Sequence, residues 1–207
     1  MSYHFALFGG SFDPPHFGHL HIIESALIEL KLDKLFVVPN FLNPFKNNFY
    51  FSPKVRLEWL RILCQSLPNS FKDKVEVLDY EVCQNAPVPT YQTLQFIQRT
   101  YLLKGKIYLL IGADNVESLP KWQNFDKLKK SVEFVIIPRK DFKIPQDFKT
   151  LPFCEIDISS TEIRNQLVLK DFANLSCLVP QPILELILKE ANCKKIDKKL
   201  LKKSAKL

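Results

Sequence analysis

Short, wholly apolar segments alternate along this chain with longer segments of helical periodicity. Such apolar segments are typical of strands buried on both faces of a parallel sheet, because each following helix carries the chain back across one face. The alternation therefore predicts an α/β fold: a Rossmann-like, doubly wound parallel sheet with helices on both faces and a small C-terminal helical segment. The expected strands are residues 4–8, 35–38, 75–78, 107–111, 133–137 and 153–156, and the expected helices are residues 19–31, 53–66, 91–103, 122–130, 161–169 and a last one from residue 182.

The net charge is +7, from 29 Lys and Arg against 22 Asp and Glu. Spread over the whole chain, this charge would suggest nucleic acid or a membrane surface as a partner. However, residues 194–207 hold seven Lys and one acid, a net charge of +6, so the other 193 residues have a net charge of only +1. We therefore expect a near-neutral domain over residues 1–193, a Lys-rich tail over residues 194–207, and no nucleic-acid partner for the domain.

The rest of the composition excludes several classes of protein. Hydrophobic residues make up 46% of the chain, with 17 Phe, which is enough for a core and excludes wholesale disorder. No apolar run approaches the roughly 18 residues of a membrane span, and the N-terminus lacks the pattern of a secretory signal. The five Cys are widely spaced with no C-x-x-C pair, so we expect reduced thiols and a cytoplasmic protein without a membrane partner.

Histidine is concentrated at the start of the chain, where all four His lie within 21 residues beside three of the five Gly. This segment follows the first expected strand and opens the first helix, a place where backbone N–H groups bind anions. Gly9 and Gly10 let the backbone approach a phosphate, and Ser11 adds a hydroxyl donor. His16 and His19, three residues apart, can point at the same anion. The segment contains neither G-x-G-x-x-G nor G-x-x-x-x-G-K-[ST], which excludes the dinucleotide fingerprint and the Walker loop.

Two other interpretations of this segment are weaker. One is a metal site, disfavoured because neighbouring His would face different sides of a helix and no zinc-type pair occurs elsewhere; its members would be Asp13, His16, His19 and His21. The other is a simple turn. That is the better interpretation for His4 and His21, whereas the joint placement of His16 and His19 argues against it.

A second segment of unusual chemistry spans residues 158–164, Ile-Ser-Ser-Thr-Glu-Ile-Arg. It predicts a capped helix start, in which the hydroxyls of Ser159 and Ser160 accept hydrogen bonds from free backbone N–H groups. Arg164 lies one turn into that helix and can reach back to its start as a bidentate phosphate clamp. Because ligands of doubly wound sheets lie beyond the carboxyl ends of the strands, we expect both segments at the same edge of the sheet.

Together these segments resemble the H-x-G-H nucleotidyltransferase superfamily. The resemblance rests on Gly-Gly-Ser-Phe-Asp-Pro-Pro-His-Phe-Gly-His at residues 9–19 and Ser-Ser-Thr-x-Ile-Arg at residues 159–164. Within the superfamily, Ile-Gly-Ala-Asp-Asn-Val-Glu-Ser-Leu-Pro-Lys-Trp at residues 111–122 and Leu-Val-Pro at residues 178–180 resemble the bacterial nicotinate-nucleotide adenylyltransferase family. The resemblance runs to about Glu190 and leaves the Lys-rich tail outside.

The resemblance implies adenylyl transfer from ATP to nicotinate mononucleotide in NAD biosynthesis, giving the deamido dinucleotide and pyrophosphate. The implied partners are these two substrates, and the implied cofactor is Mg²⁺ that arrives with ATP, with no metal-binding residues of the protein. His16, His19 and Arg164 would be the catalytic residues and hold the phosphates. The residues implied in ATP binding are Gly9, Gly10, Ser11, Phe12, Gly112, Asp114, Ile158, Ser159, Ser160 and Thr161, and those implied in mononucleotide binding are Lys46, Thr90 and Trp122.

Two segments depart from the family pattern, both on the mononucleotide side. The usual Pro-Pro-His-Lys is Asn-Pro-Phe-Lys at residues 43–46, and the usual Ser-Tyr-Thr is Val-Pro-Thr at residues 88–90. The resemblance places Thr90 against the nicotinate carboxylate and stacks Trp122 on the pyridine ring. Alternative roles are a core anchor for Trp122, a turn cap for Asp114 and a solvated side chain for Lys46.

Two alternative functions remain open at this point. A related adenylyltransferase acting on phosphopantetheine would share the His and Ser-Ser-Thr segments, but the Gly-Ala-Asp and Leu-Pro-x-Trp run disfavours it. A non-catalytic nucleic-acid-binding protein would instead use the Lys-rich tail. Arg56 and Arg139 are further candidate phosphate contacts, to which the sequence assigns no role.

Overall fold

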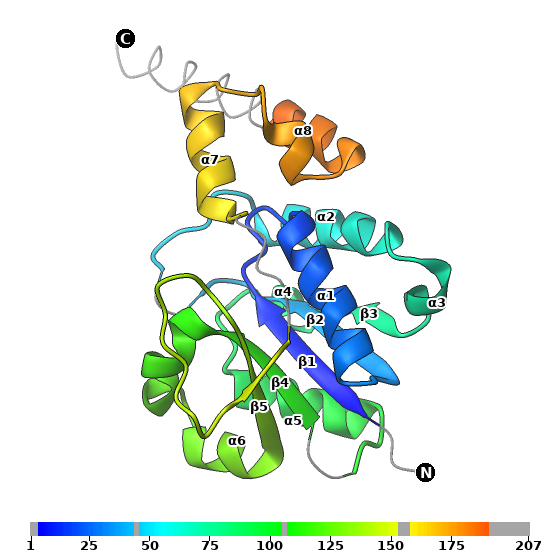
Figure 1. Cartoon of the computed structure of the whole chain (residues 1–207), viewed down its shortest axis with the longest axis vertical. Coiled ribbons are helices and arrows are strands. Elements are labelled where there is room, and N and C mark those ends of the chain that lie inside the picture. The colour runs from blue at the N-terminus through cyan, green and yellow to red at the C-terminus, as the bar shows by residue number, and fades with distance from the viewer. Residues whose placement is uncertain (1–3, 44–45, 105–106, 153–157, 191–207) are drawn as a thin grey trace.

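The computed structural model describes residues 4–43, 46–104, 107–152 and 158–190. Over these residues the chain forms one parallel sheet of six strands in the order β3-β2-β1-β4-β5-β6 (Figure 1). The strands are β1 (Phe5–Gly10), β2 (Lys34–Pro39), β3 (Val75–Val77), β4 (Ile107–Gly112), β5 (Val132–Ile137) and β6 (Lys149–Thr150). Because β1 pairs in parallel with both β2 and β4, the strand order reverses beside β1, and the predicted doubly wound fold is confirmed.

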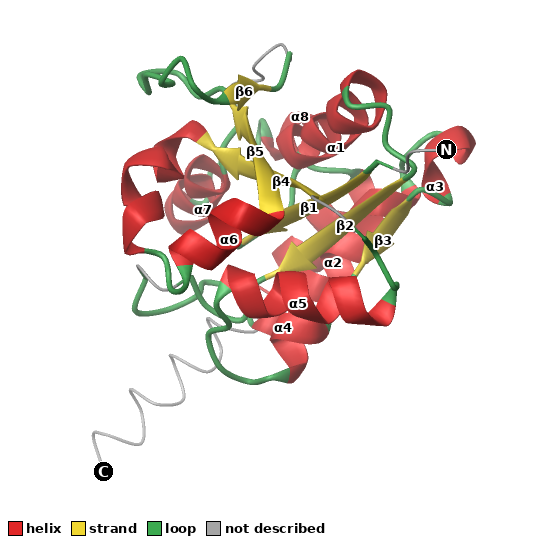
Figure 2. Cartoon of the chain, turned by 90° about the horizontal axis from the view of Figure 1, so that it is seen from below, coloured by secondary structure: helices red, strands yellow, loops and turns green. Residues whose placement is uncertain are grey.

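Helices lie on both faces of this sheet, with α1 above the strands and α5 below them in Figure 2. The helices are α1 (Phe17–Glu29), α2 (Pro53–Gln65), α3 (Asn69–Lys72), α4 (Tyr80–Cys83), α5 (Thr90–Thr100), α6 (Phe125–Ser131), α7 (Ser160–Leu169), α8 (Leu175–Leu178), the 3-10 helix η1 (Ala113–Lys121) and a helix over residues 181–190. Successive residues of a strand point to opposite faces. In β1, Ala6 and Phe8 therefore join the core shared with α1 and α2, whereas Leu7 joins the core shared with α5 and α6.

The structure differs from the sequence prediction at several element boundaries. α1 begins at Phe17 instead of residue 19. The helix expected from residue 122 begins only at Phe125, because Asn124 adopts a left-handed backbone conformation (φ 59°) before it, and η1 precedes it unpredicted. The strand expected at residues 153–156 lies outside the described residues. The sequence does not predict β6, since this exposed edge strand of Lys and Thr has no apolar run.

The C-terminal helices form the small helical segment that the sequence predicts, at the top of Figure 1. α7, α8 and the helix over residues 181–190 share buried side chains that continue the core under α1 and α2, namely Ile163, Leu167, Leu175, Val179, Ile183 and Ile187. None of the helices in the described ranges is long and apolar enough to cross a membrane. The predicted tail over residues 194–207 lies outside those ranges, so the boundary at residue 193 stays a prediction.

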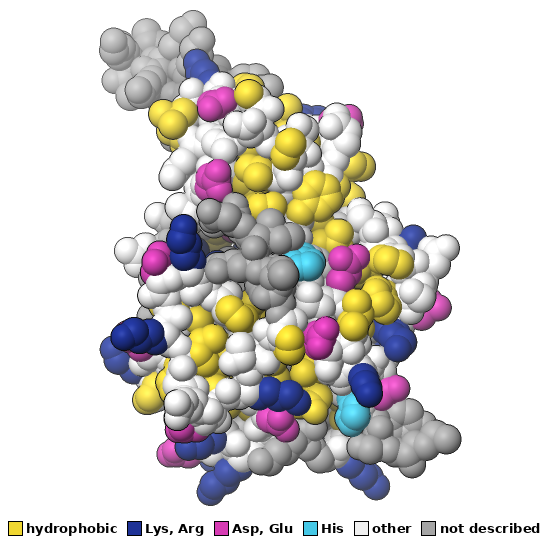
Figure 3. Space-filling model, viewed as in Figure 1, with side chains coloured by type: hydrophobic (Ala, Val, Ile, Leu, Met, Phe, Trp, Pro, Cys, Tyr) yellow, Lys and Arg dark blue, Asp and Glu magenta, His cyan; other side chains and the backbone are white. Residues whose placement is uncertain are grey.

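Charged side chains of both signs are interspersed over the face of the molecule shown in Figure 3. No continuous basic surface covers the described residues on this face.

Candidate active site

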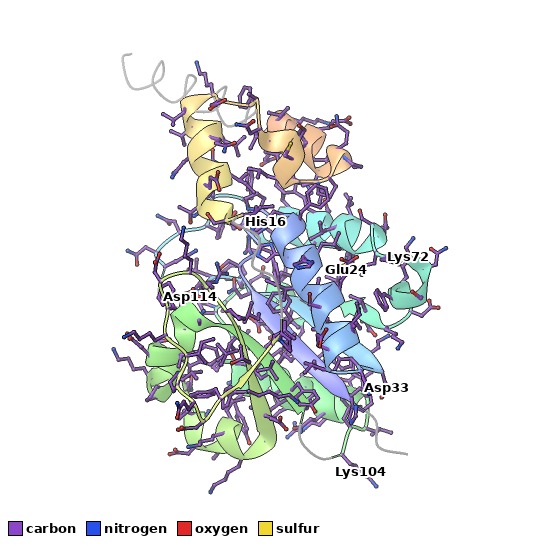
Figure 4. The ribbon with its side chains drawn as sticks, viewed as in Figure 1. His16, Glu24, Asp33, Lys72, Lys104 and Asp114 are labelled. Atoms are coloured by element: carbon purple, nitrogen blue, oxygen red, sulfur yellow. The ribbon has the colours of Figure 1, made fainter. Side chains whose placement is uncertain are left out.

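A cavity of about 570 Å³ opens at the carboxyl ends of the strands, beside the point where the strand order reverses. Its wall includes Gly10 at the end of β1, Gly112 at the end of β4, and Asn40 just after β2. Doubly wound sheets bind their ligands at this position. Figure 4 shows His16 between the start of α1 and the first turn of α7, with Asp114 to one side.

His16 and His19 form a close pair at the start of α1. His16 is the N-cap residue and only 5% exposed, and the two ring centroids lie 3.8 Å apart. The backbone N–H of His16 donates to Nδ1 of His19 (3.2 Å), so a neutral His19 ring carries its proton on Nε2. Nδ1 of His16 is buried without a hydrogen-bond partner among the described residues. At least one ring nitrogen of the pair is therefore left for a ligand.

Burial keeps both imidazoles neutral near physiological pH. Loss of hydration, followed by the charge of Arg139, lowers the pKa of His16 from 6.5 to about 3. The pKa of His19 is lowered well below 6.5, first by burial and then by His16 and Arg139. The pair thus offers uncharged N–H donors, and the negative charge of a bound phosphate would favour protonation of either ring.

Gly18 separates the two histidines and leaves room for the His16 ring, which a side chain at this position would crowd. A Cβ built on Gly18 would lie 3.0 Å from both Cε1 and Nδ1 of the His16 ring, which is tighter than most Cβ contacts in proteins, so the ring would have to shift by a few tenths of an ångström. The His-x-Gly-His spacing therefore places two rings on one helical turn and leaves the space that the first ring needs.

The loop between β1 and α1 is held by buried polar contacts. The carboxylate of Asp13 accepts hydrogen bonds from the backbone amides of Tyr50 (2.8 Å) and Phe51 (2.9 Å). The guanidinium of Arg56 is part of the scaffold, since the residue is 1% exposed and its N–H groups are directed at protein carbonyls. Those acceptors are the backbone oxygens of Ser11, Asn40 (2.8 Å), Phe41 (2.8 Å) and Phe51 (3.1 Å). Arg56 is therefore not placed to bind a phosphate.

The first turn of α7 packs against the loop that carries His16. Ser160 Oγ donates to the carbonyl of Pro14 (2.9 Å), and Arg164 Nη1 donates to the carbonyl of Asp13 (2.6 Å). These bonds join residues that are 146 and 151 positions apart in the chain. The two segments that the sequence singles out separately therefore meet at one cavity.

The same turn keeps hydrogen-bond donors available at the cavity. Ser159 caps α7 by accepting the amide of Glu162 (3.1 Å), as the sequence predicts. Arg164 Nη2 donates to Thr161 Oγ1 (2.9 Å). A guanidinium carries five N–H donors, so the two protein contacts of Arg164 leave donors for a phosphate in the cavity that it lines.

Asp114 and Arg139 form an ion pair over Gly112. Arg139 Nε lies 3.0 Å from Asp114 Oδ1, and both side chains are about two-fifths exposed, at 43% and 41%. A Cβ on Gly112 would collide with the carboxylate of Asp114 and lie 3.1 Å from Arg139 Nε. Arg139, which the sequence leaves unassigned, thus lines the cavity and acts on the pKa values of both histidines.

Another part of the wall carries Lys46, Thr90 and Trp122. The indole Nε1 of Trp122 donates to Ser118 Oγ (3.3 Å) and the ring packs against the α5–α6 core, so Trp122 both anchors η1 and borders the cavity. Glu81 also lines this part and is only 7% exposed. The sequence does not single it out, because one acid on a four-residue helix produces no periodic or motif signal.

Among the described residues predicted for the site, Ile158 is the exception, since it packs against the core and is not part of the cavity wall. Phe45, one of the departures from the family pattern, lies outside the described residues. The predicted residues that line the cavity are Gly9, Gly10, Ser11, Phe12, His16, His19, Lys46, Thr90, Gly112, Asp114, Trp122, Ser159, Ser160, Thr161 and Arg164.

The fold and the cavity chemistry define a class of enzyme that handles phosphates with helix N-termini, neutral imidazoles and arginine. In agreement, residues 7–166 match the family described as cytidylyltransferase-like. The chain is 44% identical over 184 residues to "Probable nicotinate-nucleotide adenylyltransferase" of Campylobacter fetus subsp. fetus, covering 89% of this chain and 94% of that one. It is 46% identical over 159 residues to the protein of the same name from Nitratiruptor sp., covering 77% and 86%. The chain belongs to the nicotinate-nucleotide adenylyltransferase family.

A solved structure has a fold similar to that of this chain. Plasmodium falciparum nicotinic acid mononucleotide adenylyltransferase complexed with NaAD superimposes with a TM-score of 0.76 at 22% identity, over 91% of this chain and 96% of that one. At this identity the similarity concerns the fold, which agrees with the doubly wound sheet described above.

Proposed function

We propose that this chain transfers the adenylyl group of ATP to nicotinate mononucleotide, forming nicotinate adenine dinucleotide and releasing pyrophosphate. The observation that carries the proposal is the meeting of the His16–His19 pair with the first turn of α7 at one cavity, which extends to Thr90 and Trp122. The names of the most similar relatives support the choice of substrates.

In this reaction an oxygen of the mononucleotide phosphate attacks the α-phosphorus of ATP in line. The bond between that phosphorus and the oxygen of the leaving pyrophosphate breaks. Because the attacking phosphate is already anionic near neutral pH, no general base is required. His16 and His19 donate N–H groups to the α-phosphoryl oxygens, and Arg164 stabilises the charge that develops on pyrophosphate.

The remaining predicted residues position the two substrates. Ser11, Ser159, Ser160 and the backbone of residues 9–10 bind ATP phosphates, and Gly112 with Asp114 binds its ribose. Lys46 binds the mononucleotide, Thr90 meets the nicotinate carboxylate, and Trp122 stacks on the pyridine ring. Each of these assignments is supported by a position on the cavity wall.

Adenylyl transfer from ATP uses a divalent cation, which we propose to be Mg²⁺. Among the residues that the structure describes, no group of three or more His, Cys, Asp and Glu is arranged to hold a metal ion. Both carboxylate oxygens of Asp13 accept hydrogen bonds from backbone amides. We propose that the cation enters with ATP, because Mg²⁺ in nucleotide sites is commonly bound by substrate phosphates and water.

The reaction is tested by measuring pyrophosphate release from ATP with three acceptors: nicotinate mononucleotide, nicotinamide mononucleotide and phosphopantetheine. We expect the first acceptor to be strongly preferred, because a site built to bind a carboxylate rejects the amide. His19→Ala should lower kcat by at least about a hundredfold without loss of folding, since it removes a donor to the transition state. A near-wild-type rate for His19→Ala, or turnover of phosphopantetheine alone, would contradict the proposal.

The Lys-rich tail is tested by deleting residues 194–207. If residues 1–193 are the catalytic domain, the shortened chain should keep its kcat and both KM values. A protein that acts through its tail should instead lose salt-sensitive nucleic-acid binding on the same deletion, with no pyrophosphate release before or after it.

A further inference from the structure

Glu81 is a buried acid at the acceptor end of the cavity, and the reaction proposed above does not use it. The residue is 7% exposed and lines the cavity together with Thr90. It lies on α4, where its neighbour Val82 is 4% exposed. Glu81 makes no ion pair with another residue of the described ranges. Burial raises the pKa of its carboxyl to about 7, and a hydrogen bond from Thr93 acts in the opposite direction.

A buried acid in this position lowers the stability of the fold. A carboxyl without a cation loses hydration on burial, and an apolar side chain in its place would be less costly. Leu94, next to Thr93 on α5, is fully buried, so the hydrogen bond lies beside the hydrophobic core. The hydrogen bond from Thr93 offsets part of this cost.

That hydrogen bond ties α4 to the first turn of α5. The hydroxyl of Thr93, 1% exposed, donates to Oε1 of Glu81 at 2.6 Å. Thr90 is the first residue of α5, and Thr93 lies three residues further, so the two are neighbours on one side of the helix. The amides of Gln92 and Thr93 both donate to the carbonyl of Pro89, which closes this turn. Glu81 thus restrains the turn that presents Thr90 to the cavity.

We propose that Glu81, through Thr93, is a positioning residue that sets how the start of α5 receives the carboxylate on the ring of the acceptor. The proposal rests on the proposed function, since it assigns this role to the acceptor subsite. The start of α5 has free backbone N–H groups, as every helix N-terminus does, and these together with the Thr90 hydroxyl suit a carboxylate. Removing the restraint should weaken the binding of the acceptor and leave the ATP subsite unaffected.

The test compares four single variants of the full chain, Glu81→Ala, Glu81→Gln, Thr93→Val and Thr93→Ser, together with one double variant and one control. KM for nicotinate mononucleotide, KM for ATP and kcat are measured from pyrophosphate release, with thermal unfolding as a check on folding. We expect Glu81→Ala and Thr93→Val to raise KM for the mononucleotide about tenfold, as for the loss of one buried hydrogen bond to a charged or polar group. KM for ATP should stay within about twofold.

The conservative variants should restore binding. Thr93→Ser keeps the hydroxyl donor, and Glu81→Gln keeps an oxygen that accepts it, so both should have a near-wild-type KM for the mononucleotide. The Glu81→Ala/Thr93→Val double variant should be no worse than Glu81→Ala alone, because both changes remove one bond. Thr100→Val, at an exposed position near the end of the same helix, is the control and should change nothing.

Three outcomes would overturn the proposal: an unchanged mononucleotide KM in Thr93→Val, additive effects in the double variant, or KM values for ATP and the mononucleotide that rise together. The same experiment separates this failure from failure of the proposed function. If the wild-type chain itself releases no pyrophosphate with nicotinate mononucleotide, the function is wrong. If the wild type is active and the variants have the same KM for nicotinate mononucleotide as the wild type, only the role of Glu81 is wrong.

Discussion

Mild acid should destabilise this protein through His16, whose buried ring resists protonation. The pKa of its imidazole is about 3, because of burial and the nearby Arg139, against 6.5 for an unperturbed histidine. Between these two values the unfolded chain takes up a proton that the folded chain does not. The free energy of unfolding therefore decreases as the pH falls below about 6.5, and this loss levels off only near pH 3.

The size of the effect follows from the proton uptake of the unfolded imidazole. Between about pH 7 and about pH 5.5 that uptake lowers the free energy of unfolding by about 1.3 kcal/mol for His16. The pKa of His19 is also lowered well below 6.5, so the proton uptake of its unfolded imidazole lowers the free energy of unfolding further in the same direction. The loss from His16 alone is a measurable part of a typical net stability of about 5–15 kcal/mol.

The measurement is urea unfolding of the wild type and of His16→Asn at both pH values, followed by circular dichroism. Asn does not titrate and is a favoured N-cap residue, so the start of α1 should be preserved. On acidification the variant should lose about 1.3 kcal/mol less than the wild type, with the same dependence on urea concentration. Equal losses in the two proteins would show that His16 is protonated in the folded state, and the reasoning would be refuted.

Further predictions concern the loops around the cavity. Gly18→Ala should lower kcat at least about tenfold by displacing the His16 ring, while the stability of α1 changes little; circular dichroism and pyrophosphate release measure the two effects. Arg56→Lys should lower the free energy of unfolding by about 3 kcal/mol or more, because an ammonium cannot reach the carbonyls that the guanidinium bridges; an unchanged urea midpoint would contradict this. Asp114→Asn should change stability by less than about 0.5 kcal/mol, since its ion pair is partly exposed, yet raise KM for ATP in steady-state kinetics.

Much of the fold follows from local pattern. The apolar runs of β1, β2, β4 and β5 and the capped start of α7 are visible in the chain itself, because burial on both faces and helix capping each demand particular residue types. Elements without such demands are not predicted. Exposed β6 has no apolar run, and η1 depends on packing beneath the sheet edge, where Val116 and Leu119 are buried.

Parts of the site are equally local. His16 and His19 come together because they lie three residues apart at one helix start, and Gly18 between them follows from the space that the first ring requires. A chain of this sequence therefore determines its histidine pair before any tertiary contact is made.

Only the tertiary structure decides what these histidines meet and how they are charged. Arg164 reaches the carbonyl of Asp13 across 151 residues, and Arg56 becomes scaffold because four carbonyls from separate loops surround it. Glu81 accepts its hydrogen bond from Thr93 only because α4 packs beside α5. A side chain loses hydration only when segments distant in the sequence cover it, so no local pattern encodes this loss. At the cavity, the loss of hydration keeps His16 and His19 neutral.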